Sequence, residues 1–97
     1  MENFDLLFEK MSENYNYLQT IMGEVYERVK NDPTDESNIQ LLEGLGNLAK
    51  RMLSTEASFV TSYGTTDDAV ILMDRIEDKQ TSLSRSLEET TLGSIRK

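Results

Sequence analysis

The sequence of 97 residues contains no cysteine, no histidine and no tryptophan, and it has a single proline. The absence of cysteine and histidine excludes disulfides, thiolate nucleophiles, imidazole acid–base catalysis and the common ligand sets of zinc. Phosphate-binding glycine loops are also absent, because Gly44 and Gly46 lie in a predicted helix and match neither dinucleotide nor P-loop spacing. Carboxylates are therefore the remaining candidates for metal binding or acid–base chemistry.

Acidic residues recur at helical spacing in two places, Glu24 with Glu27, and Asp74 with Glu77 and Asp78. Arg28 and Lys30 lie at helical neighbour positions to the first pair, a mixture typical of a solvated face. A di-iron site in a helical bundle would need histidine beside its glutamates. We therefore predict no catalytic, metal-binding or cofactor-binding residues, no cofactor, and no enzymatic activity.

Acidic residues outnumber basic ones by 18 to 10, so the net charge is −8. This balance argues against direct binding to nucleic acid or to an anionic membrane, since both need a basic surface. The longest apolar run, Ala69 to Met73, is far shorter than the roughly 20 residues of a membrane span. The N-terminus lacks the basic and apolar regions of a secretory signal. We expect a cytoplasmic protein, bacterial or in a host cytosol.

Apolar residues in the first third of the chain recur at alternating steps of four and three, which is a heptad pattern. The positions are Phe4, Phe8, Met11, Tyr15, Leu18, Met22, Val25 and Val29. The pattern predicts a helix over residues 3–31, ended by Asp32 before Pro33. Asp32 can cap a second helix over 33–63, with Pro33 in its first position and Gly64 after its end.

The second helix carries a matching apolar seam that only Glu56 interrupts, at Leu42, Leu45, Ala49, Met52, Phe59 and Tyr63. Folding back at residues 33–34 pairs positions whose numbers sum to about 67, so Phe4 would meet Tyr63 and Met11 would meet Glu56. The same rule places Gly23 level with Gly44, where two glycines would let the backbones approach closely. The first 64 residues thus predict a long antiparallel hairpin.

A third helix is predicted over about residues 66–92, starting either with Thr65 and Asp68 or with Thr66 followed by Asp67 and Asp68. Its apolar stripe is strong in the first half and thins toward the C-terminus. We divide the chain into a hairpin oligomerisation core, 1–64, and a third helix with a less ordered partner-docking tail, 65–97. Whether residues 88–97 are ordered stays open.

The second helix is apolar over too wide an arc for one partner, because a further stripe follows Ile39, Leu53 and Val60. Either the third helix packs on this stripe or a second chain does. We predict a homo-oligomer that also contacts another protein through its C-terminal helix. The predicted interface residues are Leu7, Ile21, Ile39, Leu53, Val60, Ile76, Leu83 and Leu87.

The short acidic turn Asp32-Pro33-Thr34-Asp35 between two long helices resembles the layout of three families. These are phage small-terminase oligomerisation hairpins, type III secretion needle subunits and small secreted Trp-x-Gly hairpins. The chain has no Trp-x-Gly turn, residues 65–97 exceed a needle subunit, and no DNA-binding helix-turn-helix precedes the hairpin. On size, we favour a viral or mobile-element assembly component over a housekeeping protein.

The predicted fold is all-α with coiled-coil-like packing, and the leading functional hypothesis is a non-enzymatic assembly or adaptor protein, such as a small-terminase-like oligomer. Two alternatives stay open. The net charge of −8 suits an acidic inhibitor or decoy that covers a basic surface of a nucleic-acid enzyme. The thin stripe of the third helix suits a secretion-type chaperone.

Overall fold

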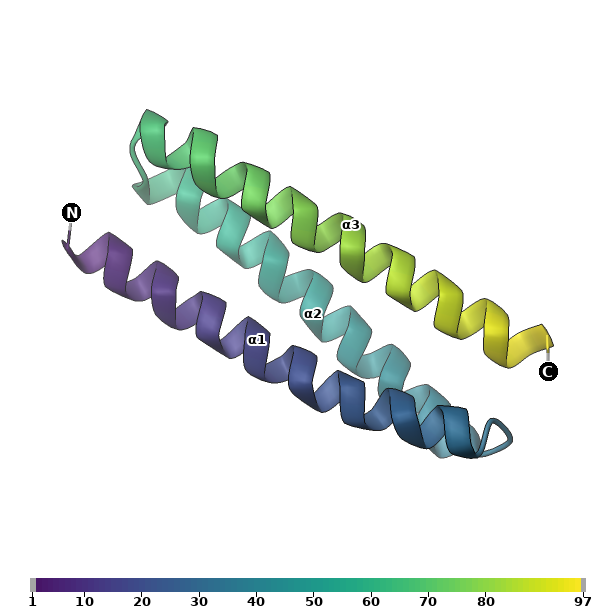
Figure 1. The fold of residues 1–97 in the computed structure, drawn as a ribbon. Helices are drawn as coiled ribbons and strands as arrows, with labels where there is room; N and C mark the ends of the chain where they lie inside the picture. Colours follow the sequence, from purple (N-terminus) through teal and green to yellow (C-terminus); the bar gives the residue numbers. More distant parts are fainter. Residues whose placement is uncertain (1, 97) are drawn as a thin grey trace.

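The computed structural model describes the backbone of residues 2–96 and the side chains of residues 3–88. Three helices follow one another, α1 (Glu2–Asn31), α2 (Glu36–Tyr63) and α3 (Thr66–Arg96), and this range contains no strand. Helix α2 packs against both α1 and α3 and runs antiparallel to each, so α1 and α3 point the same way (Figure 1). The predicted all-α hairpin with a third helix is confirmed.

The turn between α1 and α2 is longer than predicted, because Asp35 rather than Asp32 caps α2. The Asp35 carboxylate accepts a hydrogen bond from the Ser37 amide at 3.0 Å. Asp32 instead accepts from the amide and the hydroxyl of Thr34 at 3.2 and 2.6 Å. The prediction that α2 begins at Pro33 is therefore wrong: the Asp32 side chain stabilises the turn, and the Asp35 side chain accepts from one free amide of the first helical turn, that of Ser37.

Only Gly64 and Thr65 connect α2 to α3. The Thr65 hydroxyl accepts from the Asp68 amide at 3.1 Å, and the Asp68 carboxylate accepts from the Thr65 amide at 3.0 Å. This reciprocal pair is a capping box with aspartate in the third helical position, the first of the two predicted starts. Its hydrogen bonds hold the pKa of Asp68 below its usual value.

Gly64 is needed for space rather than for a left-handed backbone, since its φ of −82° is ordinary. A Cβ atom there would lie 2.7 Å from the Val60 carbonyl oxygen and 3.1 Å from the Phe4 ring. Residue 64 therefore sits in a tight corner, where α2 ends against the start of α1.

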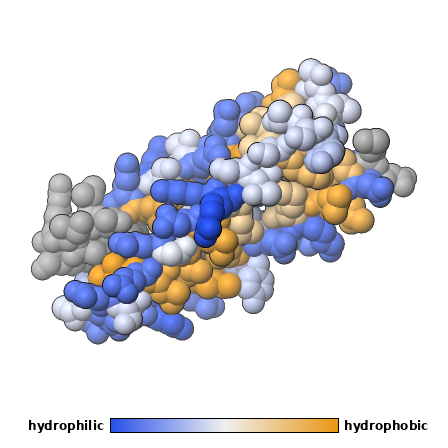
Figure 2. Space-filling model, turned by 180° about the vertical axis from the view of Figure 1, so that it is seen from behind, coloured by the Kyte–Doolittle hydropathy of each residue, from blue (hydrophilic) through white to orange (hydrophobic). Residues whose placement is uncertain are grey.

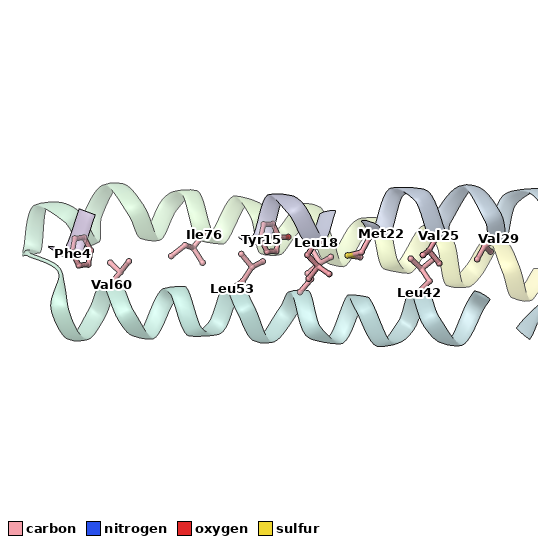
Figure 3. Packing of buried hydrophobic residues seen from close by; sticks show 12 residues of the cluster. Phe4, Tyr15, Leu18, Met22, Val25, Val29, Leu42, Leu53, Val60 and Ile76 are labelled. Carbon is pink, nitrogen blue, oxygen red and sulfur yellow. The ribbon is translucent and has the colours of Figure 1, made fainter. Parts of the chain in front are cut away.

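The core is a row of buried apolar side chains along the long axis of a molecule measuring 48 × 19 × 14 Å. Figure 3 shows this row between α2 and the other two helices. Its members are Phe4, Tyr15, Leu18, Met22, Val25, Val29, Leu42, Ala49, Leu53, Val60, Ile76 and Leu83. Six come from α1, the helix with the regular heptad pattern, which explains why the hairpin was predictable from periodicity.

The aromatic end of the hairpin pairs differently from the prediction. The Phe4 ring stacks on Phe59 at a centroid distance of 5.1 Å, one turn before its predicted partner. That partner, Tyr63, is 66% exposed, and its ring centre lies 5.4 Å from the Phe59 ring centre. The expectation that Tyr63 belongs to the core is thus wrong, because Phe59 already covers the Phe4 ring.

The glycines that permit close packing are also different from those predicted. A Cβ atom at Gly23 or Gly44 would meet nothing within 4 Å, so these residues do not bring α1 and α2 together. At Gly46 a Cβ would lie 2.7 Å from a terminal methyl of Leu87. The close approach therefore occurs between α2 and α3, where Leu87 fills the space that a side chain at position 46 would take.

Candidate functional site

The eight residues predicted for an interface divide into two groups. Four lie in the core formed by this single chain, with exposures of 4% or less: Leu53, Val60, Ile76 and Leu83. Leu7 is 51% exposed, whereas Ile21, Ile39 and Leu87 are half-buried. The further stripe on α2 is thus filled by α3 of the same chain, and a second chain could reach Leu53 or Val60 only if α3 moved away.

A different apolar strip remains uncovered on the hairpin. It follows Leu7, Met11 and Ile21 on α1, and Leu41, Leu48 and Met52 on α2. Leu41 and Leu48 are 45% and 40% exposed. The same strip holds a groove of about 380 Å³ that is lined only by α1 and α2, at Met11, Asn14, Leu48, Arg51, Met52, Thr55 and Glu56. Helix α3 therefore leaves one side of the hairpin open.

The hydrophobic surface of the molecule is not continuous, because polar side chains interrupt it. Figure 2 shows this on the face opposite to that of Figure 1, where hydrophobic patches lie between hydrophilic ones. In the groove, Asn14, Arg51 and Thr55 supply the polar part of the lining. The groove therefore combines apolar and polar side chains.

A second groove, of about 330 Å³, lies where α1 faces the distal part of α3. Met22, Leu42 and Leu87 supply its apolar lining, and Gln19 and Ser86 are polar. Among the side chains that the structure describes, those lining this groove are all uncharged.

The most unusual side chain of the molecule is Glu56, which is 1% exposed in the middle of the core. Neither of its carboxylate oxygens accepts a hydrogen bond from a described protein group. Burial raises the pKa of Glu56 more than the nearby charge of Lys79 and the polar Ser12 lower it. A charged carboxylate is costly in such a place, because the protein has removed its water without replacing it with partners.

The neighbours of Glu56 come from the other two helices. Lys79 of α3 places its ammonium 5.4 Å from the ring centre of Tyr15 on α1. The Tyr15 hydroxyl accepts a hydrogen bond from Gln19 at 2.6 Å, and burial raises the pKa of Tyr15. We call Ser12, Tyr15, Glu56 and Lys79 the central polar cluster. One feature of the sequence indicated this cluster, because Glu56 interrupts an otherwise apolar seam. Only the structure shows which residues surround Glu56.

Tyr17 and Tyr26 lie outside the heptad positions of α1 and are 70% and 39% exposed. Lys30 lies 5.9 Å from the Tyr26 ring centre and 4.0 Å from the Glu27 carboxylate. Glu27 thus shares an exposed face with a base, as its neighbours in the sequence predicted. These contacts describe a solvated surface rather than a reaction centre.

Among the described residues, no three or more acidic side chains gather where they could hold a metal ion. The same range contains no helix with the length and apolar character needed to cross a membrane. The segment whose order stayed open, residues 88–97, has a helical backbone to Arg96, but its side chains after Glu88 lie outside the described residues. No family model matches the chain, and no similar protein was found among curated proteins or solved structures.

Proposed function

We propose that the chain is a non-enzymatic helical assembly protein that associates with a second copy of itself through the α1–α2 hairpin. The observation that carries this proposal is the uncovered strip around Leu41 and Leu48, which lies on the side of the hairpin not covered by α3. Two hairpins packed through such strips would form a four-helix core of the kind common in bundles. An assembly role in a virus or mobile element remains part of this proposal.

The test is absolute molar mass by light scattering, measured across protein concentration and at low and high salt. We expect a discrete multiple of 11.1 kDa that persists in salt, since apolar contacts are not screened. Leu41→Lys with Leu48→Lys should reduce the mass to that of one chain while leaving the helical circular dichroism unchanged. Val70→Lys with Ile71→Lys is the matched control, because these α3 residues are 65% and 56% exposed.

The proposal fails if the wild-type protein has the mass of one chain at every concentration. It also fails if both double variants dissociate the assembly equally, since the effect would then come from added charge rather than from the strip.

The acidic inhibitor is the second candidate, favoured by charge that the chain does not neutralise internally. Of its 18 acidic residues, only Glu13 and Glu27 form ion pairs within the described range. A decoy of this kind should bind a basic enzyme with an affinity that falls steeply as salt rises. An affinity that stays constant as the salt concentration rises tenfold, from about 50 to about 500 mM, would exclude this candidate.

A further inference from the structure

Helix α3 is held to the rest of the molecule mainly by α2. Its fully buried contributions within the described side chains are Ile76 and Leu83, with Leu72, Met73 and Leu87 half-buried beside them. Against α1 it places the Lys79 ammonium over the Tyr15 ring. The link to α2 is two residues long. The α1–α2 hairpin has its own apolar seam, which includes six buried residues of α1.

Glu56 lies between the other two helices: it borders the groove between α1 and α2, and Lys79 of α3 is close enough to lower its pKa. The titratable groups that face it are Tyr15 from α1 and Lys79 from α3, and Ser12 of α1 is the further polar neighbour. Lys79 is half-buried and forms no ion pair with Glu56 within 4.0 Å. A negative charge on Glu56 is therefore incompletely compensated while α3 is in place, and it regains water when α3 moves away.

The protonated side chain carries no such penalty, because a neutral carboxyl loses far less hydration on burial. We propose that Glu56 makes α3 a releasable cover: protonation of this residue docks α3 on the hairpin, and ionisation favours its release. Release uncovers the α2 stripe that includes Leu53 and Val60, which the docked helix holds at 0% exposure.

The test is amide hydrogen exchange of the full-length protein followed by NMR, expressed as protection factors so that the intrinsic pH dependence of exchange is removed. In the wild type, protection of α3 amides should fall by up to about tenfold per pH unit above pH 4.5, the ordinary pKa of the group, and then level off. Protection of α1 amides should change less, because the hairpin stays closed.

Glu56→Gln keeps the shape of the side chain and removes the titration, so α3 protection should become independent of pH. Glu43→Gln is the matched control on the exposed side of the same helix, and it should behave like the wild type. Two results would overturn the proposal: an unchanged pH dependence in Glu56→Gln, or an equal loss of protection in all three helices, which would mean that only global unfolding is linked to the proton.

Lys79→Met provides a second test that does not alter Glu56. It removes the nearby positive charge that lowers the pKa of Glu56. The loss of α3 protection relative to the wild type should therefore grow from pH 4 to pH 8. In the Lys79→Met, Glu56→Gln double variant this growth should disappear. Growth that persists in the double variant would show that Lys79 acts through another group and would contradict the proposal.

Discussion

The seam between α1 and α2 and the seam between α2 and α3 are built differently although they share one helix. Helix α1 contributes six buried apolar side chains in a regular heptad pattern, whereas α3 contributes two among the described residues. The α3 seam adds a close approach at Gly46, and Lys79 of α3 lies near the buried Glu56. The two seams of one helix can thus differ in how much apolar surface they bury, and the α3 seam is the weaker of the two by this measure.

Matched truncations in the two seams are expected to have the largest effect. Leu18 and Leu83 are 6% and 4% exposed, so replacing either with alanine leaves a cavity of similar chemistry. Leu18→Ala should lower the free energy of unfolding by about 3 kcal/mol, as measured by urea denaturation. Leu83→Ala should lower the free energy of unfolding by about 2 kcal/mol, because α3 can shift to fill part of the cavity.

Hydrogen exchange separates the two variants further. Leu83→Ala should reduce protection chiefly in α3, whereas Leu18→Ala should reduce it in the whole hairpin. If both variants lost protection equally in all three helices, the two seams would not differ in stability.

Gly64→Ala should destabilise the fold by about 2 kcal/mol, because the new Cβ would overlap the Val60 carbonyl oxygen and crowd the Phe4 ring. The obstructing oxygen belongs to the backbone and cannot rotate away. Thermal unfolding checks the expectation, with Ser62→Ala as a nearby exposed control that should change stability by less than about 0.5 kcal/mol. An unchanged melting temperature in Gly64→Ala would show that the connection has room to adjust.

Glu56→Gln should raise the free energy of unfolding by about 1 kcal/mol at pH 7. The pKa of Glu56 is higher in the folded than in the unfolded state, so its stabilising contribution is complete below pH 4.5 and is lost as pH rises toward the folded-state pKa. The variant and the wild type should therefore have equal stability near pH 4 and diverge above it. A constant difference across this range would assign the effect to packing instead of charge.

The smallest expected effects come from two glycines of α2 that are two residues apart. Gly44→Ala should stabilise the protein by about 0.8 kcal/mol through helix propensity, since its Cβ would meet nothing. Gly46→Ala should lose that gain or become destabilising, because its Cβ would press on the Leu87 methyl groups. Adding Leu87→Ala to Gly46→Ala should recover part of the loss in urea denaturation, and failure to do so would place the strain elsewhere.

Local patterns predicted the three helices and their order because the heptad repeat, the capping residues and the proline act over a few positions. Asp68 and Thr65 form their cap within a single turn, and Val25 and Val29 are buried as their spacing indicated. The start of α2 was misplaced because Asp32 and Asp35 are equally good caps in the sequence, and only the geometry of the turn selects between them. The central polar cluster was not predicted, because its members come from all three helices.

The sequence by itself determined that the chain is helical, which face of α1 is buried, and where Gly64 ends α2, since each depends on periodicity or on one local backbone choice. The tertiary structure decided that α3 of the same chain fills the stripe at Leu53 and Val60, and that Glu56 is buried without a partner. An apolar stripe attracts any complementary helix equally, so its occupant depends on the length and path of the connection. Whether a polar residue in the seam is buried likewise depends on which side chains the neighbouring helices place around it.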